Sequence, residues 1–327
     1  MTAPHASPVI SVVVPCFNTA PYLPATLKSV EEQTFQDFEV LLVDDGSSDD
    51  TLAVLHAWAA TDSRFKVIAL VRNQGIVAAR NAALAVASGE YVALLDSDDV
   101  WTPGALAQRL AVARRYPSAD VIATDFAWFE EELPTTPVGR VGLGPGGARL
   151  FAHSFATGEP VLCTEPFEAF ASVQFAWVAA TLVRRAAMTA IGNFDPTVKT
   201  VEDTLLWLRL AQRGAFVFMP QITAYYRQRA GSIIALGKGP KELPYLTVLD
   251  WVKDRPEFAA HRAVIQRIRA QCHHIGATYY RGIGETAAAV KHAFSAVQAQ
   301  PWGWIYWRGL AAASSDWLRK KVSPPTL

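Results

Sequence analysis

Hydrophobic residues in the first hundred positions gather into short runs, and a polar turn follows each run. The runs are rich in β-branched residues and predict buried strands at 9–14, 38–43, 65–71 and 91–95. The segments between them carry apolar residues at helical spacing, beginning with a helix from about 21 to 33. This alternation predicts an α/β fold, a Rossmann-like, mostly parallel sheet with helices on both faces.

The second half of the chain is less regular. Further strands are predicted at 120–129, 175–183 and 216–226. Between about 134 and 166 the periodicity fails and Gly and Pro accumulate, which is typical of a functional or disordered loop and suggests the acceptor side. After about residue 240 the composition changes to helices rich in Ala, His, Gln and Arg.

These changes predict two regions. Residues 1–235 would form the α/β domain, with a nucleotide-binding half at about 9–130 and an acceptor-side half at about 131–235. Residues 236–327 would form a helical C-terminal extension.

Acidic residues follow two of the predicted strands. Asp44 and Asp45 come after the second strand, and Asp96, Asp98 and Asp99 come after the fourth. Ligands of α/β sheets usually bind at the carboxyl ends of the strands. Carboxylates this close repel one another unless a cation lies among them, which points to Mg²⁺ or Mn²⁺ carrying a substrate's phosphates. Turn chemistry, or an N-cap by Asp98 or Asp99, is the alternative.

Two further charged residues allow two interpretations each. Thr200 and Asp203 have the spacing of a capping box, but Asp203 could also be a general base. The two roles compete, since a helix N-terminus stabilises the anion whereas a base benefits from a raised pKa; a desolvated pocket or a nearby acid could restore the balance. Arg80 could be a surface charge or an anion contact.

Composition excludes some classes of function. The 327 residues carry a formal net charge of zero, which argues against nucleic acid as a partner. Three widely separated cysteines form neither a metal spacing nor a disulfide framework, so a reducing cytoplasm is expected. The N-terminus does not resemble a secretory signal, and no apolar run is long enough to span a membrane.

The segment 301–321 is dense in aromatic residues and ends in basic ones. Trp302, Tyr306, Leu310, Ala313 and Trp317 would share one face of a helix. Such a helix can lie peripherally in a membrane interface, or pack against the main domain or a second subunit in a homodimer.

Taken together, these motifs resemble the family 2 glycosyltransferases, which are inverting enzymes with the GT-A fold. The resemblance spans residues 9 to about 232 and rests on the order and spacing of several short motifs. They lie at 12–18, 43–47, 73–75 with 79–81, 95–99, 192–195 with 202–203, and 226–227.

The resemblance implies a role for each matched residue. Asp203 would be the catalytic base, and Asp98 would hold the metal, Mn²⁺ or Mg²⁺, on the donor diphosphate. The remaining donor-binding residues would be Pro15, Phe17, Asn18, Asp45, Arg80 and Asp96. Supporting roles would fall to Asp44, Asp99, Glu202 and Arg227.

The implied reaction is a single transfer from a nucleotide-sugar donor, expected to be UDP-linked, to a hydroxyl of a glycan, a lipid-linked acceptor or a small molecule. Two alternatives stay open. A sugar nucleotidyltransferase would have a Gly-rich loop with Arg and Lys after the first strand, where this chain has Pro15 to Asn18. A non-catalytic nucleotide-sugar binding protein would not need Asp203.

Overall fold

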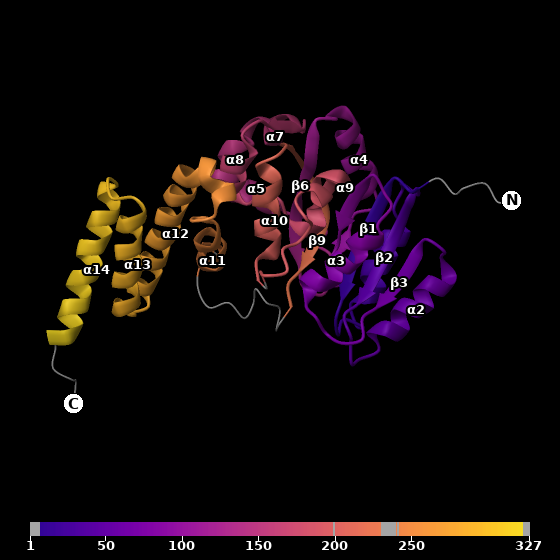
Figure 1. Ribbon diagram of the computed structural model, residues 1–327, viewed down its shortest axis with the longest axis horizontal. Coiled ribbons are helices and arrows are strands. Elements are labelled where there is room, and N and C mark those ends of the chain that lie inside the picture. The colour runs from indigo at the N-terminus through magenta and orange to yellow at the C-terminus, as the bar shows by residue number, and fades with distance from the viewer. Residues whose placement is uncertain (1–6, 199, 230–239, 241, 323–327) are drawn as a thin grey trace. The chain divides into compact units, whose positions relative to one another are not determined.

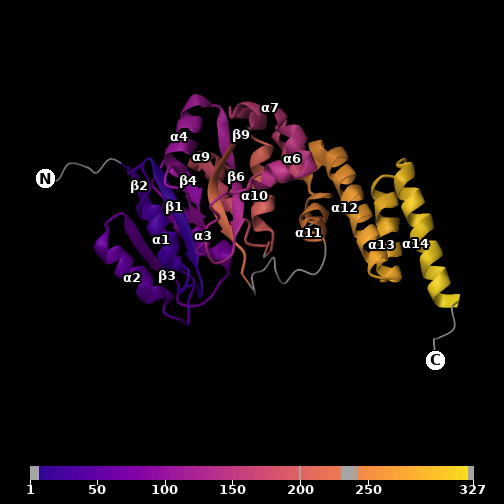
Figure 2. The same ribbon diagram turned by 180° about the vertical axis from the view of Figure 1, so that it is seen from behind.

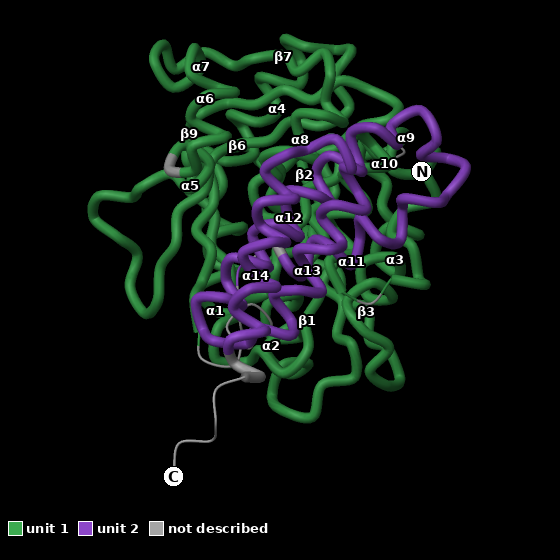
Figure 3. The backbone as a smooth tube through the Cα atoms, turned by 90° about the vertical axis from the view of Figure 1, so that its left-hand side faces the viewer, with its two compact units in different colours: residues 1–229 green, residues 230–327 purple. Residues whose placement is uncertain are grey.

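The computed structural model describes residues 7–198, 200–229, 240 and 242–322. The chain folds into two compact units, residues 1–229 and 230–327 (Figure 3). The predicted domain boundary after residue 235 lies outside the described residues and stays a prediction.

The first unit contains one nine-stranded sheet. Its main path runs β3-β2-β1-β4-β8-β6-β9-β5, and β7 pairs with β9 (Figure 1). The strands are β1 (Ile10–Cys16), β2 (Phe38–Asp44), β3 (Phe65–Ala69), β4 (Tyr91–Leu94), β5 (Val100–Trp101), β6 (Ala119–Phe129), β7 (Val161–Cys163), β8 (Thr181–Arg184) and β9 (Ala215–Arg227).

Helices lie on both faces of this sheet (Figures 1 and 2). The longer ones are α1 (Leu23–Glu31), α2 (Thr51–Thr61), α3 (Ile76–Val86), α4 (Ala105–Arg115), α8 (Pro166–Val173) and α10 (Glu202–Ala211). The shorter ones are α5 (Arg140–Leu143), α6 (Pro145–Leu150), α7 (Ala152–Thr157), the 3₁₀ helix η1 (Val178–Ala180) and α9 (Arg185–Ala190).

The predicted α/β fold is confirmed, and the direction of the strands divides the sheet in two. β1 to β4 are parallel to one another, as the strand–helix alternation predicts. In the other half, β8 is antiparallel to β4 and β6, and β5 and β7 are antiparallel to β9. The sheet as a whole is therefore mixed. All seven residues of β1 and all seven of β2 are buried, as expected for inner strands covered on both faces.

Two predicted segments differ from the structure. The strand expected at 175–183 begins only at Thr181, because Phe175 instead packs edge-on against Phe151 in an aromatic cluster. The stretch 134–166, expected to lack regular structure, contains α5, α6, α7 and β7. The Asp125 carboxylate on β6 accepts a hydrogen bond from the Val141 amide of α5 at 2.9 Å, so the preceding strand stabilises this helical turn.

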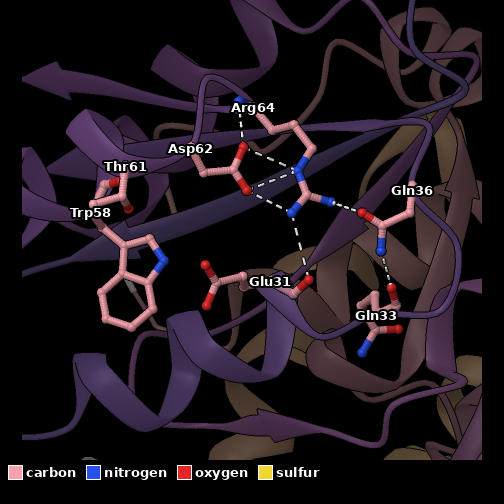
Figure 4. A network of polar contacts seen from close by, with 7 residues as sticks. All are labelled: Glu31, Gln33, Gln36, Trp58, Thr61, Asp62 and Arg64. Atoms are coloured by element: carbon pink, nitrogen blue, oxygen red, sulfur yellow. Dashed lines mark hydrogen bonds and ion pairs between the residues drawn. The ribbon is translucent and has the colours of Figure 1, made fainter.

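A polar network ties the amino ends of β2 and β3 to α1 (Figure 4). The Arg64 guanidinium pairs with Asp62 at 2.6 Å, donates to the Gln36 side chain at 2.6 Å, and lies 4.4 Å above the Phe38 ring. In a parallel sheet this edge is opposite to the carboxyl ends of the strands. The network therefore contributes to the fold rather than to the predicted site.

The second unit is helical, as predicted. It contains α11 (Glu242–Val252), the 3₁₀ helix η2 (Pro256–His261), α12 (Arg262–Gly282), α13 (Thr286–Ala299) and α14 (Trp304–Val322). Small residues let α12, α13 and α14 approach closely around a core of Ala277, Ala289, Ala293 and Ala313, against which Leu310 packs. None of the helices in the described ranges is long and apolar enough to cross a membrane.

Candidate active site

The loops after β1, β2 and β4 meet at one edge of the sheet, because β1 lies between the other two strands and runs parallel to both. This edge carries the predicted donor-binding residues. Pro15 is part of β1, Phe17 and Asn18 follow it, and Asp44 closes β2. Phe17 is 44% exposed, so its ring is available to a ligand at this edge.

The loops after β1 and β2 are joined by hydrogen bonds. The Asn18 backbone has φ 51°. Its side-chain oxygen accepts from the Ser48 backbone amide at 2.8 Å, and its backbone amide donates to the Ser47 hydroxyl at 3.0 Å. The Asp44 carboxylate accepts from the Ser47 amide at 3.2 Å. Asn18 and Asp44 therefore shape the rim of the site.

Asp45 is buried and holds the next loop. Its two carboxylate oxygens accept from the Gln74 and Gly75 amides, both at 2.8 Å. Gly75 has φ +91°, a conformation that L side chains rarely adopt, and it precedes α3. In this structure Asp45 thus fixes the start of α3, and each oxygen keeps one lone pair for a ligand.

Arg80 on α3 is not a surface charge: its side chain is 2% exposed. Its two terminal nitrogens donate to the carboxylates of Asp96 and Glu202, both at 2.7 Å. The guanidinium also lies 5.1 Å from the centre of the Phe194 ring. Arg80 therefore joins the loop after β4 to the start of α10.

Asp203 lies on α10 beside this ion-pair network. The helix begins at Glu202 after Val201, which has φ 53° and acts as N-cap without a side-chain hydrogen bond. The capping box between Thr200 and Asp203 is therefore absent, and the Asp203 carboxylate accepts from the Thr204 amide at 2.7 Å.

Burial, reinforced by the charge of Glu202, raises the pKa of Asp203 to about 6; Arg80 opposes the rise and Asp96 adds to it. A carboxyl group with this pKa is ionised at neutral pH yet basic enough to take a proton from a hydroxyl group in a transition state. Desolvation and a nearby acid, either of which could offset the effect of the helix N-terminus on this pKa, are thus both present.

The Asp98–Asp99 turn is fixed by Arg227 from β9. Arg227 donates its amide to Asp99 at 3.0 Å and its Nε to the Asp98 carbonyl at 2.9 Å. Asp99 is fully buried, and its Oδ2 has no hydrogen-bond partner in the described part of the chain. Burial and the charges of Asp96 and Asp98 raise the pKa of Asp99 well above its ordinary value, while the Arg227 amide and guanidinium lower it.

Asp98 faces a different partner. Its Oδ2 accepts from Nε of Arg229 at 2.7 Å. Burial and the charge of Asp96 raise the pKa of Asp98, while Arg229 lowers it. A cation between Asp96 and Asp98 would relieve the same repulsion.

The residues present fit a divalent metal only together with a substrate. Among the described residues, no three His, Cys, Asp or Glu side chains are grouped so as to hold a metal ion. Mg²⁺ is usually bound through one or two carboxylates plus substrate phosphates, and Asp96 and Asp98 supply that number of protein ligands.

Sequence reasoning missed Arg229 altogether and gave Arg227 only an unspecified supporting role. Both contact the acidic loop from about 130 positions further along the chain, Arg227 as the last residue of β9 and Arg229 from two residues beyond it. The available signal was the pair of arginines at the end of a predicted strand, separated by Gln228 alone. A strand exposes alternate residues on the same face, so Arg227 and Arg229 could have been expected to act together.

Comparisons with known proteins agree with this geometry. Residues 11–141 match the family model described as glycosyl transferase family 2. A relative from Escherichia coli, named UDP-Glc:alpha-D-GlcNAc-diphosphoundecaprenol beta-1,3-glucosyltransferase WfgD, is 36% identical over 104 residues, which are 32% of this chain and 40% of that protein. The match thus spans less than half of the length of this relative, and the same holds for several others.

Solved structures support the fold over most of the chain. Staphylococcus aureus TarS 1–349 in complex with UDP-GlcNAc has a TM-score of 0.62 and 21% identity, covering 89% of this chain and 81% of that one. The mannosyltransferase PcManGT from Pyrobaculum calidifontis, in complex with GDP-Man and Mn²⁺, has a TM-score of 0.59 and 18% identity, covering 95% and 81%. The predicted GT-A-type fold is therefore confirmed.

Proposed function

Since residues 11–141 match the model of glycosyl transferase family 2, we propose that the chain is an inverting glycosyltransferase of this family that uses a nucleotide-sugar donor, with UDP as the nucleotide. The observation that carries the proposal is the raised pKa of Asp203 next to the Arg80 ion-pair network. The UDP-linked donor of the relative WfgD and the UDP-GlcNAc bound to TarS support the choice of donor.

The proposed reaction assigns one task to each part of the site. Phe17 and Asp45 border the nucleobase, and Asp96 lies near the ribose. Asp98 holds Mn²⁺ or Mg²⁺, which when bound stabilises negative charge on the leaving diphosphate. Asp203 takes the proton of an acceptor hydroxyl, whose oxygen attacks the anomeric carbon from the face opposite the diphosphate and inverts its configuration.

For the acceptor we propose the hydroxyl of a glycan, free or lipid-linked. The relative WfgD, whose name contains a diphosphoundecaprenol-linked sugar, supports the lipid-linked form. On this chain, Trp177 stacks at 5.1 Å on Phe126 and meets Tyr226 edge-on at 5.0 Å. Trp177 and Tyr226 are only partly buried, and we propose that their exposed surface packs against a sugar ring of the acceptor.

Thermal unfolding with UDP, GDP and dTDP, each with and without Mn²⁺, tests the donor site. A ligand at a hundredfold excess over its Kd stabilises a protein by about 2.7 kcal/mol. We expect UDP to stabilise the chain and Mn²⁺ to enhance the effect, and Asp98→Ala to remove the enhancement. No response to any nucleotide would overturn the proposed function. A response without any transfer activity would favour a non-catalytic nucleotide-sugar binding protein.

We also propose that the start of α14 contacts an anionic membrane surface peripherally. On α14, Trp304 is 65% and Trp307 53% exposed, whereas Ala313 is buried in the core of the second unit; Trp302, which precedes the helix, is 95% exposed. The Arg308 guanidinium lies 5.1 Å from the Trp304 ring, which places a cation beside the exposed aromatic residues.

Co-sedimentation with vesicles containing phosphatidylglycerol tests this contact. We expect binding at low salt that a triple change of Trp302, Trp304 and Trp307 to Ser removes. The chain could instead fail to bind these vesicles and form a dimer in solution that the same change dissociates. In that case the exposed tryptophans contact a second subunit and not a membrane.

A further inference from the structure

The ion pair between Asp98 and Arg229 places a fixed positive charge on the carboxylate to which the proposed function gives the metal. Arg229 Nε donates to Asp98 Oδ2 at 2.7 Å, and the two side chains are 32% and 15% exposed. A guanidinium does not lose its proton at accessible pH. A metal ion that binds this oxygen must therefore displace Arg229 or approach against its charge.

Arg229 differs from its neighbour Arg227 in what holds it. Arg227 is anchored by the carbonyls of Asp98 and Glu130, at 2.9 and 3.1 Å, and is 9% exposed. Arg229 is held by the Asp98 carboxylate and by the ring of Tyr22, which lies 5.0 Å from the guanidinium carbon. Both contacts can be exchanged for a diphosphate, which binds a guanidinium fork more strongly than a single carboxylate oxygen does.

We propose that Arg229 is an exchangeable counter-ion: it neutralises Asp98 before the donor binds and transfers to the donor diphosphate when the metal takes its place. The proposal rests on the proposed function. It assigns to Arg229 a positioning role that makes binding of metal and nucleotide mutually dependent. The chain then binds metal weakly unless a nucleoside diphosphate is present to receive the guanidinium.

Calorimetric titration of the full chain with MnCl₂, with and without UDP, measures this dependence. For the wild type, UDP should tighten Mn²⁺ binding. Arg229→Gln should tighten the binding of Mn²⁺ alone by about tenfold, an ordinary size for a coupling between two ligands. The further increase in Mn²⁺ affinity that UDP causes should become correspondingly smaller. The matched control is Arg115→Gln, since Arg115 likewise pairs with a carboxylate, Glu159, at 2.7 Å and lies over a tyrosine ring. It should change neither affinity.

A second titration uses UDP in metal-free buffer and does not depend on metal binding. Asp98→Asn removes the charge that holds Arg229, so it should raise the affinity for UDP alone by about fivefold or more. The gain should vanish in the double variant with Arg229→Gln. If Arg229→Gln unfolds, the double variant of Asp98→Asn with Arg229→Lys takes its place. Lysine retains the charge but not the guanidinium fork, so its gain in UDP affinity should be smaller than that of Asp98→Asn alone.

The outcomes separate the two proposals. If the wild type binds neither UDP nor Mn²⁺, the proposed function fails, and this inference fails with it. If both bind but Arg229→Gln leaves the Mn²⁺ affinity unchanged, or Asp98→Asn weakens UDP binding in metal-free buffer, only the exchange is overturned. In that case Arg229 has a structural role alone.

Discussion

Glu202→Gln should shift the pH dependence of sugar transfer toward acid. A general base works only when it has lost its proton, so kcat/KM should rise through the pKa of Asp203, about 6, and then level off. Glu202 is the charged neighbour that raises this pKa most after burial itself. Glutamine keeps the oxygen that accepts from Arg80 but removes the negative charge.

The size of the shift follows from the causes of the raised pKa. Burial, the largest cause, is unchanged in the variant, and the loss of one neighbouring charge typically shifts a pKa by about one pH unit, or ~1.4 kcal/mol. We therefore expect the pKa of Asp203 in the variant to be about 5. Arg80 would act in the same direction, because losing one of its two anionic partners leaves more of its charge to stabilise ionised Asp203.

These values predict how the rates differ at each pH. At about pH 5 roughly a tenth of the wild-type Asp203 is ionised, against roughly half in the variant, so the relative rate should be about fivefold higher there than at about pH 8. The assay is UDP release from the UDP-sugar with acceptor present, recorded as kcat/KM across this range. The pKa of Asp98 is raised too, but Asp98 is common to both proteins and cancels in their ratio.

Glu159→Gln is the matched control, because Glu159 also pairs with an arginine at 2.7 Å, on the surface. Its pH profile should overlay that of the wild type. An acidic limb near the ordinary pKa of an aspartate, or a profile that Glu202→Gln leaves unmoved, would refute the assignment of Asp203 as a base tuned by its neighbours.

Two other changes test the site and its scaffold. Asp203→Asn should abolish transfer, retain UDP binding and stabilise the fold at neutral pH by up to about 3 kcal/mol. Because the folded-state pKa of Asp203 is raised, ionising this carboxyl group destabilises the wild-type fold. The wild type should therefore lose stability between about pH 4 and about pH 6, and Asp203→Asn should not lose this part, as urea unfolding at the two pH values would show. Gly46→Ala should destabilise by about 1–3 kcal/mol, because Gly46 has φ +69° and its added Cβ would lie 2.6 Å from the Arg72 backbone. In the same urea assay Gly282→Ala, whose Cβ meets nothing within 4 Å, should be close to neutral, and equal effects of the two changes would contradict this account.

The first half of the fold could be predicted because its signals are local. Each buried strand is a short β-branched run, and the acids after β2 and β4 mark where those strands end. Once the strands are parallel, their carboxyl ends meet at one edge. The proximity of Asp44, Asp45 and Asp96 to the same edge therefore follows from periodicity and topology alone.

The segment 134–166 could not be predicted in this way. Its helices are four to six residues long, too short to be stable by themselves. They depend on contacts outside the segment, such as the hydrogen bonds from the α5 amides to the Asp125 carboxylate on β6. A sequence rich in Gly and Pro carries no sign of the carboxylate that the preceding strand supplies as a partner.

Arg80 shows most clearly what local reasoning cannot reach. Its position on α3 is consistent with a solvated charge, and its partners Asp96 and Glu202 lie 16 and 122 positions away. The fold buries the guanidinium between them, so one cation compensates an acid of the proposed donor site and an acid beside the proposed base. Any change in the charge of Asp96 on donor binding is then felt at Asp203 through Arg80. The pKa of Asp203 is thus a property of the assembled site, and no single motif determines it.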